Sequence, residues 1–212
     1  KIYFTFLLLL FANACFAQFY DDFSDGNYTA NPRWFMTDMD AQMVENNGGY
    51  AVGLHPIGNI ENSNLKKGSF RTANTLTDNT WWGCDLTFDV NKDSEGEIRF
   101  YLMSTLPNLS NADGYVLNID PKGKRLILAR TQNELFQTIP IMTQHNILNY
   151  GTINFSCQIT KINSAWTITC YCNEEKIWNE DVTATPDFNN STSTGFLLFE
   201  NPDNPFNLRI NS

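Results

Sequence analysis

The stretch WWGCDLTFDV, residues 81–90, decides the fold class, because apolar and polar side chains alternate along most of it. In an extended chain successive side chains point to opposite faces, so every second residue shares a face. One face would then carry Trp82, Cys84, Leu86, Phe88 and Val90. The other would carry Trp81, Asp85, Thr87 and Asp89. A strand with one apolar and one polar face is typical of an antiparallel sheet that covers a hydrophobic core.

The next stretch, GEIRFYLMS at residues 96–104, repeats this alternation with Ile98, Phe100 and Leu102 on its apolar face. Residues 91–96, NKDSEG, separate the two stretches and are rich in turn-forming residues. We therefore expect the two strands to form a hairpin.

Working outward in both directions, the same period of two returns many times, with turn clusters between the runs. Clear runs occupy residues 115–120, 124–131, 152–160, 165–172, 175–182, 195–200 and 206–211. Weaker strand signals lie at residues 19–23, 42–45, 50–55 and 69–72. The best helix candidate is the short segment 143–148. The pattern predicts an all-β fold, an antiparallel two-sheet β-sandwich.

The N-terminal residues 1–17, KIYFTFLLLLFANACFA, have the features of a secretory signal peptide. Their apolar run is too short for a membrane span of about 20 residues and ends in small residues. We expect cleavage after Ala17, which would leave Gln18 as the mature N-terminus. Cys15 allows a second interpretation, a lipoprotein cysteine, against which Asn13 argues. The sequence therefore predicts a secreted, extracellular or cell-surface protein.

Residues 18–212 are expected to form a single β-sandwich domain with one large core. The last predicted strand reaches the end of the chain, so we expect this domain to be truncated at its C-terminal end and further domains to follow. The net charge of the chain is −9 without any basic block, which argues against nucleic acid as a partner. With 14% aromatic and only 17% charged residues, the chain is globular rather than disordered. No second membrane span follows the signal peptide.

Four cysteines lie beyond the predicted signal peptide, and three of them fall in one predicted hairpin. If its turn is centred on residues 163–164, Ile159 faces Ile168, Cys157 faces Cys170 and Phe155 faces Cys172. An oxidising compartment permits disulfides, but a bridge between directly paired strands is geometrically awkward. Buried free thiols are the favoured interpretation, and a disulfide stays open for Cys84, Cys157, Cys170 and Cys172.

Several motifs together resemble a known class of domain. These are YDDFSDGNYTANPRW, WWGCDLTFDVNKDSEGEIRFYLMSTLPNL, NADGYVLNI, AWTITCYCN and STGFLLFE. In this order they resemble the N-terminal domain of large secreted bacterial surface proteins, which often carry lamin-tail domains downstream. The resemblance implies a concanavalin A-like or laminin G-like jelly roll, a cell-surface location and downstream domains of the same chain as partners. It implies no reaction.

No catalytic arrangement stands out. The E-x-D-x-x-E strand of laminarinase-like hydrolases is absent, and the acidic segments 174–181 and 200–203 are interpreted as solvated edges. His55 and His145 are the only histidines, and neither lies near a nucleophile motif. We therefore expect a non-catalytic module for adhesion or carbohydrate binding. A glycoside hydrolase of unrecognised family and a structural spacer domain are the alternatives.

The polar faces of the central strands offer a candidate ligand-binding surface. Its residues are Asp85, Glu97, Arg99, Tyr101, Asn118 and Arg130. Carboxylates and guanidinium groups bind sugar hydroxyls, and pyranose faces stack on aromatic rings. The alternative is an ordinary half-exposed sheet with cross-strand ion pairs.

The acidic cluster in YDDFSDGN suggests a structural calcium ion, the only cofactor that we predict. It is no EF-hand, because Pro32 stands where a bidentate glutamate is required. Hard oxygen ligands could come from Asp22, Asp25 and Asn27 in this segment and from Asn211 in the last strand. The alternative is a simple turn at residues 25–27.

Overall fold

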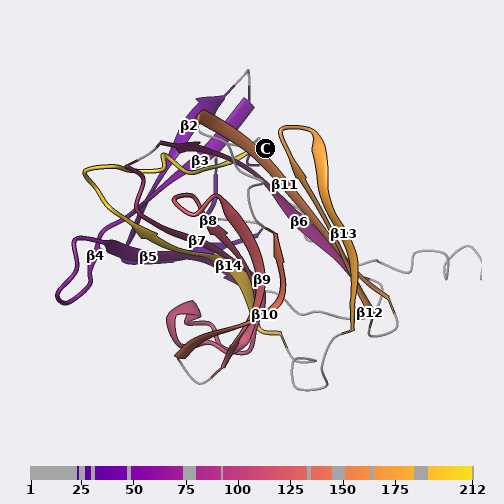
Figure 1. The fold of residues 1–212 in the computed structure, drawn as a ribbon. Helices are drawn as coiled ribbons and strands as arrows, with labels where there is room; N and C mark the ends of the chain where they lie inside the picture. Colours follow the sequence, from indigo (N-terminus) through magenta and orange to yellow (C-terminus); the bar gives the residue numbers. More distant parts are fainter. Residues whose placement is uncertain are drawn as a thin grey trace, which may run out of the picture.

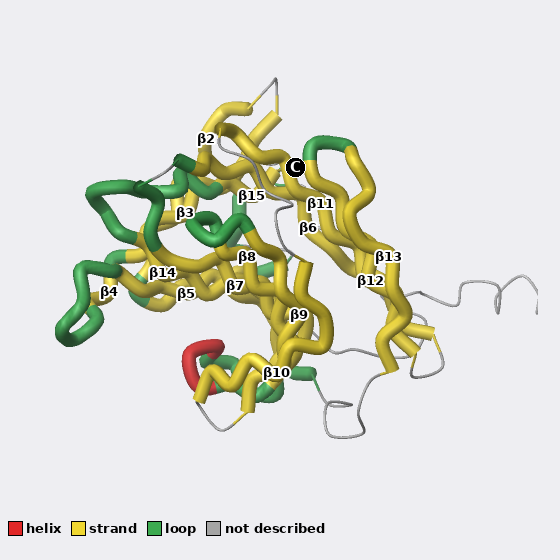
Figure 2. Tube along the Cα trace, viewed as in Figure 1, coloured by secondary structure: helices red, strands yellow, loops and turns green. Residues whose placement is uncertain are grey.

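The computed structural model is built almost entirely from strands, which form two antiparallel sheets (Figures 1 and 2). It describes residues 23, 27–29, 32–46, 49–73, 80–91, 93–132, 135–144, 151–162, 165–183 and 191–211. The predicted all-β, antiparallel two-sheet sandwich is therefore confirmed. The predicted signal peptide, Asp22 and Asp25 lie outside the described residues. In the described part of the chain no helix is long and apolar enough to span a bilayer.

One sheet, sheet A, runs from edge to edge through seven strands. Its order is β1 (Trp34–Thr37), β5 (Lys66–Ala73), β14 (Ser193–Glu200), β7 (Gly96–Ser104), β8 (Gly114–Asp120), β9 (Arg125–Gln132) and β10 (Leu135–Gln144). The short β4 (Gly58–Asn59) also pairs with β5.

The facing sheet, sheet B, has seven strands. Its order is β13 (Glu175–Thr183), β12 (Ala165–Cys172), β11 (Gly151–Ile162), β6 (Thr80–Val90), β15 (Arg209–Asn211), β3 (Gly49–Pro56) and β2 (Met39–Asn46). The last strands of the chain, β14 and β15, thus lie inside the two sheets and have strand partners on both sides.

Helical structure is confined, among the described residues, to one 3₁₀ turn, η1 (Leu109–Asn111). Thr143 and Gln144 of the short helix candidate at residues 143–148 belong to β10, so the candidate is wrong for these two residues, and its other residues lie outside the described ranges. Strand β10 was not predicted from the sequence, because Pro140 interrupts the alternation of its residues. A proline is tolerated there because β10 is an edge strand whose pairing with β9 shifts beside it.

The hairpin predicted across residues 91–96 is wrong. Strand β6 lies in sheet B between β11 and β15, whereas β7 lies in sheet A between β14 and β8. Residues 91–94 do turn, since the Asn91 amide donates to the Ser94 hydroxyl at 3.0 Å. This turn therefore carries the chain from sheet B to sheet A.

The hairpin predicted between β11 and β12 is confirmed residue by residue. Ile159 pairs with Ile168, Cys157 with Cys170 and Phe155 with Cys172. The Sγ atoms of Cys157 and Cys170 are 3.6 Å apart, and all four cysteines of the described chain are free thiols. The thiol of Cys170 also raises the pKa of Cys157, because the hydrogen bond between them and the surrounding burial favour the protonated form.

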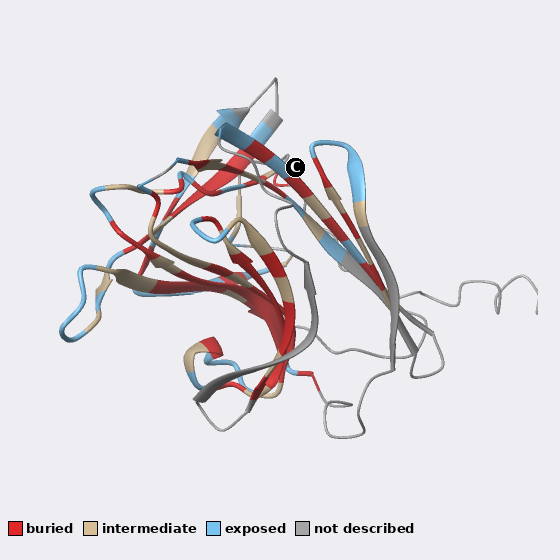
Figure 3. Cartoon of the chain, in the orientation of Figure 1, coloured by how far each residue is buried: buried red, intermediate tan, exposed pale blue. Residues whose placement is uncertain are grey.

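The core lies between the sheets, and alternation along each strand fills it (Figure 3). Sheet B contributes Leu86, Phe88 and Val90 from the alternating stretch at residues 81–90, all buried as predicted. Phe100 and Phe196 stack in sheet A at a centroid distance of 4.9 Å. Burying one such ring stabilises a fold by about 1.5–3 kcal/mol, so this shared apolar layer holds the two sheets face to face.

Candidate functional site

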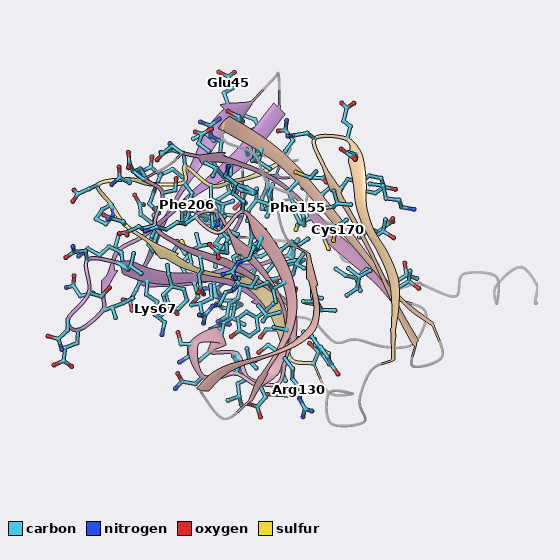
Figure 4. All side chains as sticks on the ribbon, in the orientation of Figure 1. Glu45, Lys67, Arg130, Phe155, Cys170 and Phe206 are labelled. Atoms are coloured by element: carbon cyan, nitrogen blue, oxygen red, sulfur yellow. The ribbon has the colours of Figure 1, made fainter. Side chains whose placement is uncertain are left out.

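Sheet A has a second face, turned away from the core, that we call the outer face of sheet A. Residues paired directly across neighbouring strands share a face, which fixes its composition. One cross-strand row runs Leu197, Arg99, Asn118, Ile127. A neighbouring row runs Lys67, Phe199, Glu97. Figure 4 shows Lys67 on the opposite side of sheet A from the core residues Phe155 and Cys170.

The loop that contains η1 covers one part of this face. Leu109 and Ala112 of that loop pack with Tyr101, Val116 and Ala129 in a second apolar cluster. Tyr101 is only 2% exposed, and burial raises the pKa of its hydroxyl. The expectation that Tyr101 offers a ring for sugar stacking is therefore wrong, because the loop already occupies that ring.

Arg99, Glu97, Phe199 and Lys67 occupy the neighbouring part of the face. Both the Nε and Nη2 atoms of Arg99 donate to Oε2 of Glu97, at 2.7 and 2.5 Å. The guanidinium lies 4.4 Å from the Phe199 ring centroid, and the Lys67 ammonium lies 5.8 Å from it. Partial burial lowers the pKa of Lys67 and the charge of Arg99 lowers it further, while Asp38 acts in the opposite direction. Two cations thus lie within cation–π distance of the Phe199 ring.

Asn118 lies directly opposite Arg99 in the middle of this face. Its side chain is 4% exposed, and its Oδ1 atom is shielded from solvent without a hydrogen-bond partner. A buried acceptor left unpaired costs about 1–3 kcal/mol, so it is uncommon in a folded protein. A group from a bound ligand that donates a hydrogen bond would remove that cost.

Two of the predicted ligand-binding residues do not belong to this face. Asp85 lies on β6 in the other sheet, where it is exposed opposite Ser156. Arg130 follows the alternation of the buried Leu126 and Leu128, so it projects toward the core side of sheet A. The expectation that all six residues form one surface is therefore wrong, because strands β6 and β7 are not neighbours and because Arg130 has the opposite parity to Asn118.

A second cation and ring group lies on β1 and β5. Phe35 is 36% exposed and is paired with Arg71 across these strands. The guanidinium of Arg71 lies 5.1 Å from the Phe35 ring centroid, and that of Arg33 lies 5.0 Å from it. Sequence reasoning missed this group because its members come from residues far apart in the chain. The only signal available was the polar alternation of residues 69–72.

The residues proposed for calcium are engaged with other groups where they are described. Asn27 Oδ1 accepts hydrogen bonds from the amide and hydroxyl of Thr29, both at 2.7 Å, as in a turn. Asn211 Nδ2 donates to the Thr87 hydroxyl at 2.7 Å. Across the residues that the structure describes, no cluster of three His, Cys, Asp or Glu side chains could hold a metal ion.

Glu200, expected in a solvated edge, is buried instead, with 5% of its surface exposed. Its Oε1 accepts a hydrogen bond from the Phe206 amide at 2.6 Å, and His55 Nδ1 lies 3.9 Å from Oε2. Burial raises the pKa of the carboxyl, while the Phe206 amide and His55 oppose that shift. The contacts fasten the loop after β14 to the strand, which is a structural role.

Solved structures of the same architecture share little sequence with this chain. The VIP36 exoplasmic/lumenal domain bound to Ca²⁺ and Man2 superposes with a TM-score of 0.53 at 12% identity, over 84% of this chain and 78% of that one. A legume lectin-like domain from Entamoeba histolytica gives 0.50 at 11% identity, over 82% and 86%. The protein of unknown function SO2946 from Shewanella oneidensis MR-1 gives 0.58 at 15% identity, over 89% and 79%.

No protein-family model and no curated protein matches the chain. Identities at this level show the fold alone, a lectin-like jelly-roll β-sandwich. The predicted concanavalin A-like fold is thereby confirmed, whereas the bacterial surface-protein context stays a prediction.

Proposed function

We propose that the chain is a non-catalytic carbohydrate-binding module whose site lies on the outer face of sheet A around Asn118, Arg99 and Glu97. In this proposal it works outside the cell, as part of a larger bacterial surface protein in adhesion. The predicted signal peptide supports the location. The lectin-like fold supports the ligand class, since one of its structural neighbours is a domain bound to Man2.

The unpartnered Oδ1 atom of Asn118 is the observation that carries the proposal. Once the side chains that shield this atom move aside on binding, a sugar hydroxyl can donate the hydrogen bond that it lacks and accept one from the neighbouring guanidinium of Arg99. The Glu97 carboxylate, which holds that guanidinium at 2.7 Å, adds a further acceptor for hydroxyls. Planar polar groups placed close together are part of the composition that sugar sites use.

A hydrolase is less well supported by the residues that the structure describes. Glycoside hydrolysis needs two carboxyl groups about 5–10 Å apart across the scissile bond. Glu97 is held in an ion pair with Arg99, and Asp120 is held by Arg125 at 2.6 Å. Each of these two carboxylates is thus already engaged by an arginine side chain.

A structural calcium ion near residues 22–27 belongs to the same proposal. The VIP36 domain among the structural neighbours is a Ca²⁺-bound form, which supports a metal in this architecture. Asp22 and Asp25 would supply the charged ligands.

The direct test is a glycan array probed with the wild-type domain and with Arg99→Ala. We expect wild-type binding to at least one glycan class and a loss of tenfold or more in Arg99→Ala. Arg209→Ala is the matched control, because Arg209 is an exposed arginine on β15 of sheet B. Equal melting temperatures of the variants would show that folding is intact. The proposal fails if the wild type binds no glycan, or if Arg99→Ala binds as tightly as the wild type.

A further inference from the structure

We propose that the site takes anionic glycans, chains that carry carboxylate or sulfate groups, along a strip formed by Arg33, Phe35, Arg71, Lys67 and Phe199. This inference rests on the proposed function and specifies its ligand class. The strip, which we call the basic strip, extends the site around Asn118 across β14 and β5 to β1.

Within the described part of the chain, the three cations of the basic strip lie without ion-pair partners beside two aromatic rings. Arg99 is paired with Glu97, but Arg33, Lys67 and Arg71 have no ion-pair partner among the described residues. Lys67 also experiences the repulsion of Arg99, which contributes to lowering its pKa. A cation that is partly desolvated and faces another cation is stabilised by a bound anion.

The charge of this strip contrasts with that of the whole chain. The chain has 14 basic and 23 acidic residues, yet three of the basic ones form this strip, and Arg99 of the neighbouring site lies over the ring of Phe199. Among the described residues, Glu97 is paired with Arg99, and Asp38 acts on Lys67 in the opposite direction to Arg99. An acidic protein repels anionic polymers in general, so a local cationic strip would select where such a polymer can bind.

The rings are arranged to support the cations rather than to stack on a ligand. The guanidinium groups of Arg33 and Arg71 each lie about 5 Å from the centroid of the Phe35 ring. A guanidinium that lies on a ring keeps its hydrogen-bonding edge available for a planar anion. Nucleobases bind to single-strand sites chiefly by stacking on open aromatic faces, so these occupied rings favour a glycan anion over a nucleic acid.

The dimensions of the strip suit an oligosaccharide. Lys67 and Arg71 are four residues apart on β5 and share a face, which separates them by about 13 Å at the usual strand rise. Phe35 lies two strands away from Phe199 across the sheet and is offset from it by four residues along the strands. The two offsets together place the rings about 16 Å from one another. Several anionic sugar units in succession could therefore contact both groups.

The test measures binding of the wild-type domain to polygalacturonate, dextran sulfate and neutral mannan by affinity electrophoresis and calorimetry. Polygalacturonate and dextran sulfate separate carboxylate from sulfate recognition. The informative variant is Lys67→Gln/Arg71→Gln. Its matched control is Lys176→Gln/Arg209→Gln, which removes the same charge from exposed positions of sheet B. We expect the affinity of Lys67→Gln/Arg71→Gln for an anionic polymer to fall tenfold or more. The affinity of the control should stay within twofold of the wild type. Binding by the wild type should weaken at higher salt.

Three results would overturn the inference: no wild-type binding to either anionic polymer, equal losses in both double variants, or tighter binding of an oligothymidylate than of the anionic glycans. Mannan separates this failure from that of the proposed function. Wild-type binding of mannan that depends on Arg99, without binding of anionic polymers, would leave the carbohydrate-binding proposal intact and reject only the anionic ligand. Absence of binding to any glycan would reject both.

Discussion

Replacing Asn118 by leucine should make the folded protein more stable. Leucine has a similar size and removes an acceptor that is shielded from solvent and has no hydrogen-bond partner. Removing such a group without leaving another one unpaired should raise the free energy of unfolding by about 1–3 kcal/mol. For a domain of this size that corresponds to an increase in melting temperature of about 2–12 °C. The same variant should lose glycan binding, because the free acceptor is the group assigned to the ligand.

Thermal and urea unfolding of Asn118→Leu would measure the change. Asn154→Leu is the matched control, since Asn154 is also a strand asparagine but its Oδ1 accepts a hydrogen bond from the Thr87 hydroxyl at 3.0 Å. The control should be no more stable than the wild type, because it loses a satisfied hydrogen bond. A lower melting temperature for Asn118→Leu would refute the reasoning, since it would mean that the amide oxygen already has a stabilising partner in the free protein.

Three further results should follow from the fold. Gly195→Ala should lower the free energy of unfolding, measured in urea, by about 2–4 kcal/mol. Gly195 has φ +148°, and an added Cβ would lie 2.3 Å from the Phe70 carbonyl oxygen. Unchanged stability would contradict that geometry. Because burial raises the pKa of Glu200, the stability linked to its proton is complete below its ordinary pKa and declines as pH rises through the raised one. As the pH rises above the ordinary pKa of a glutamate, Glu200→Gln should therefore lose less stability than the wild type, and parallel pH profiles would count against this. In the native protein Cys157 and Cys170 should resist alkylation at about pH 8 and react after denaturation, whereas peptide mapping that finds them bridged would disprove the free thiols.

Local pattern was enough to predict much of the sandwich. The pairing of Cys157 with Cys170 followed from the position of a tight turn, because register in a hairpin is fixed by turn length and by the apolar face. The core positions Leu86, Phe88 and Ile98 followed from alternation alone. These features depend on residues close together in the sequence, which is why sequence reasoning could reach them.

The parts that failed depend on distant partners. Nothing near residues 91–96 shows that β6 joins sheet B and β7 joins sheet A, so Asp85 was wrongly grouped with Arg99. Tyr101 has the alternation of a surface residue, and only the packing of Leu109 from a later loop buries it. The ring of Phe35 between Arg33 and Arg71 requires β1 to pair with β5, a contact that no local pattern specifies.

The position of β14 and β15 inside the sheets has a consequence for how the chain folds. A chain synthesised from its N-terminus has β5 and β7 long before β14 can join them, and β3 and β6 before β15 can join them. Until residues 193–211 emerge, both sheets have open strand edges in their middles, a state that is prone to pair with other chains. Folding of this domain should therefore be slow and should wait for residues 193–211, which complete both sheets.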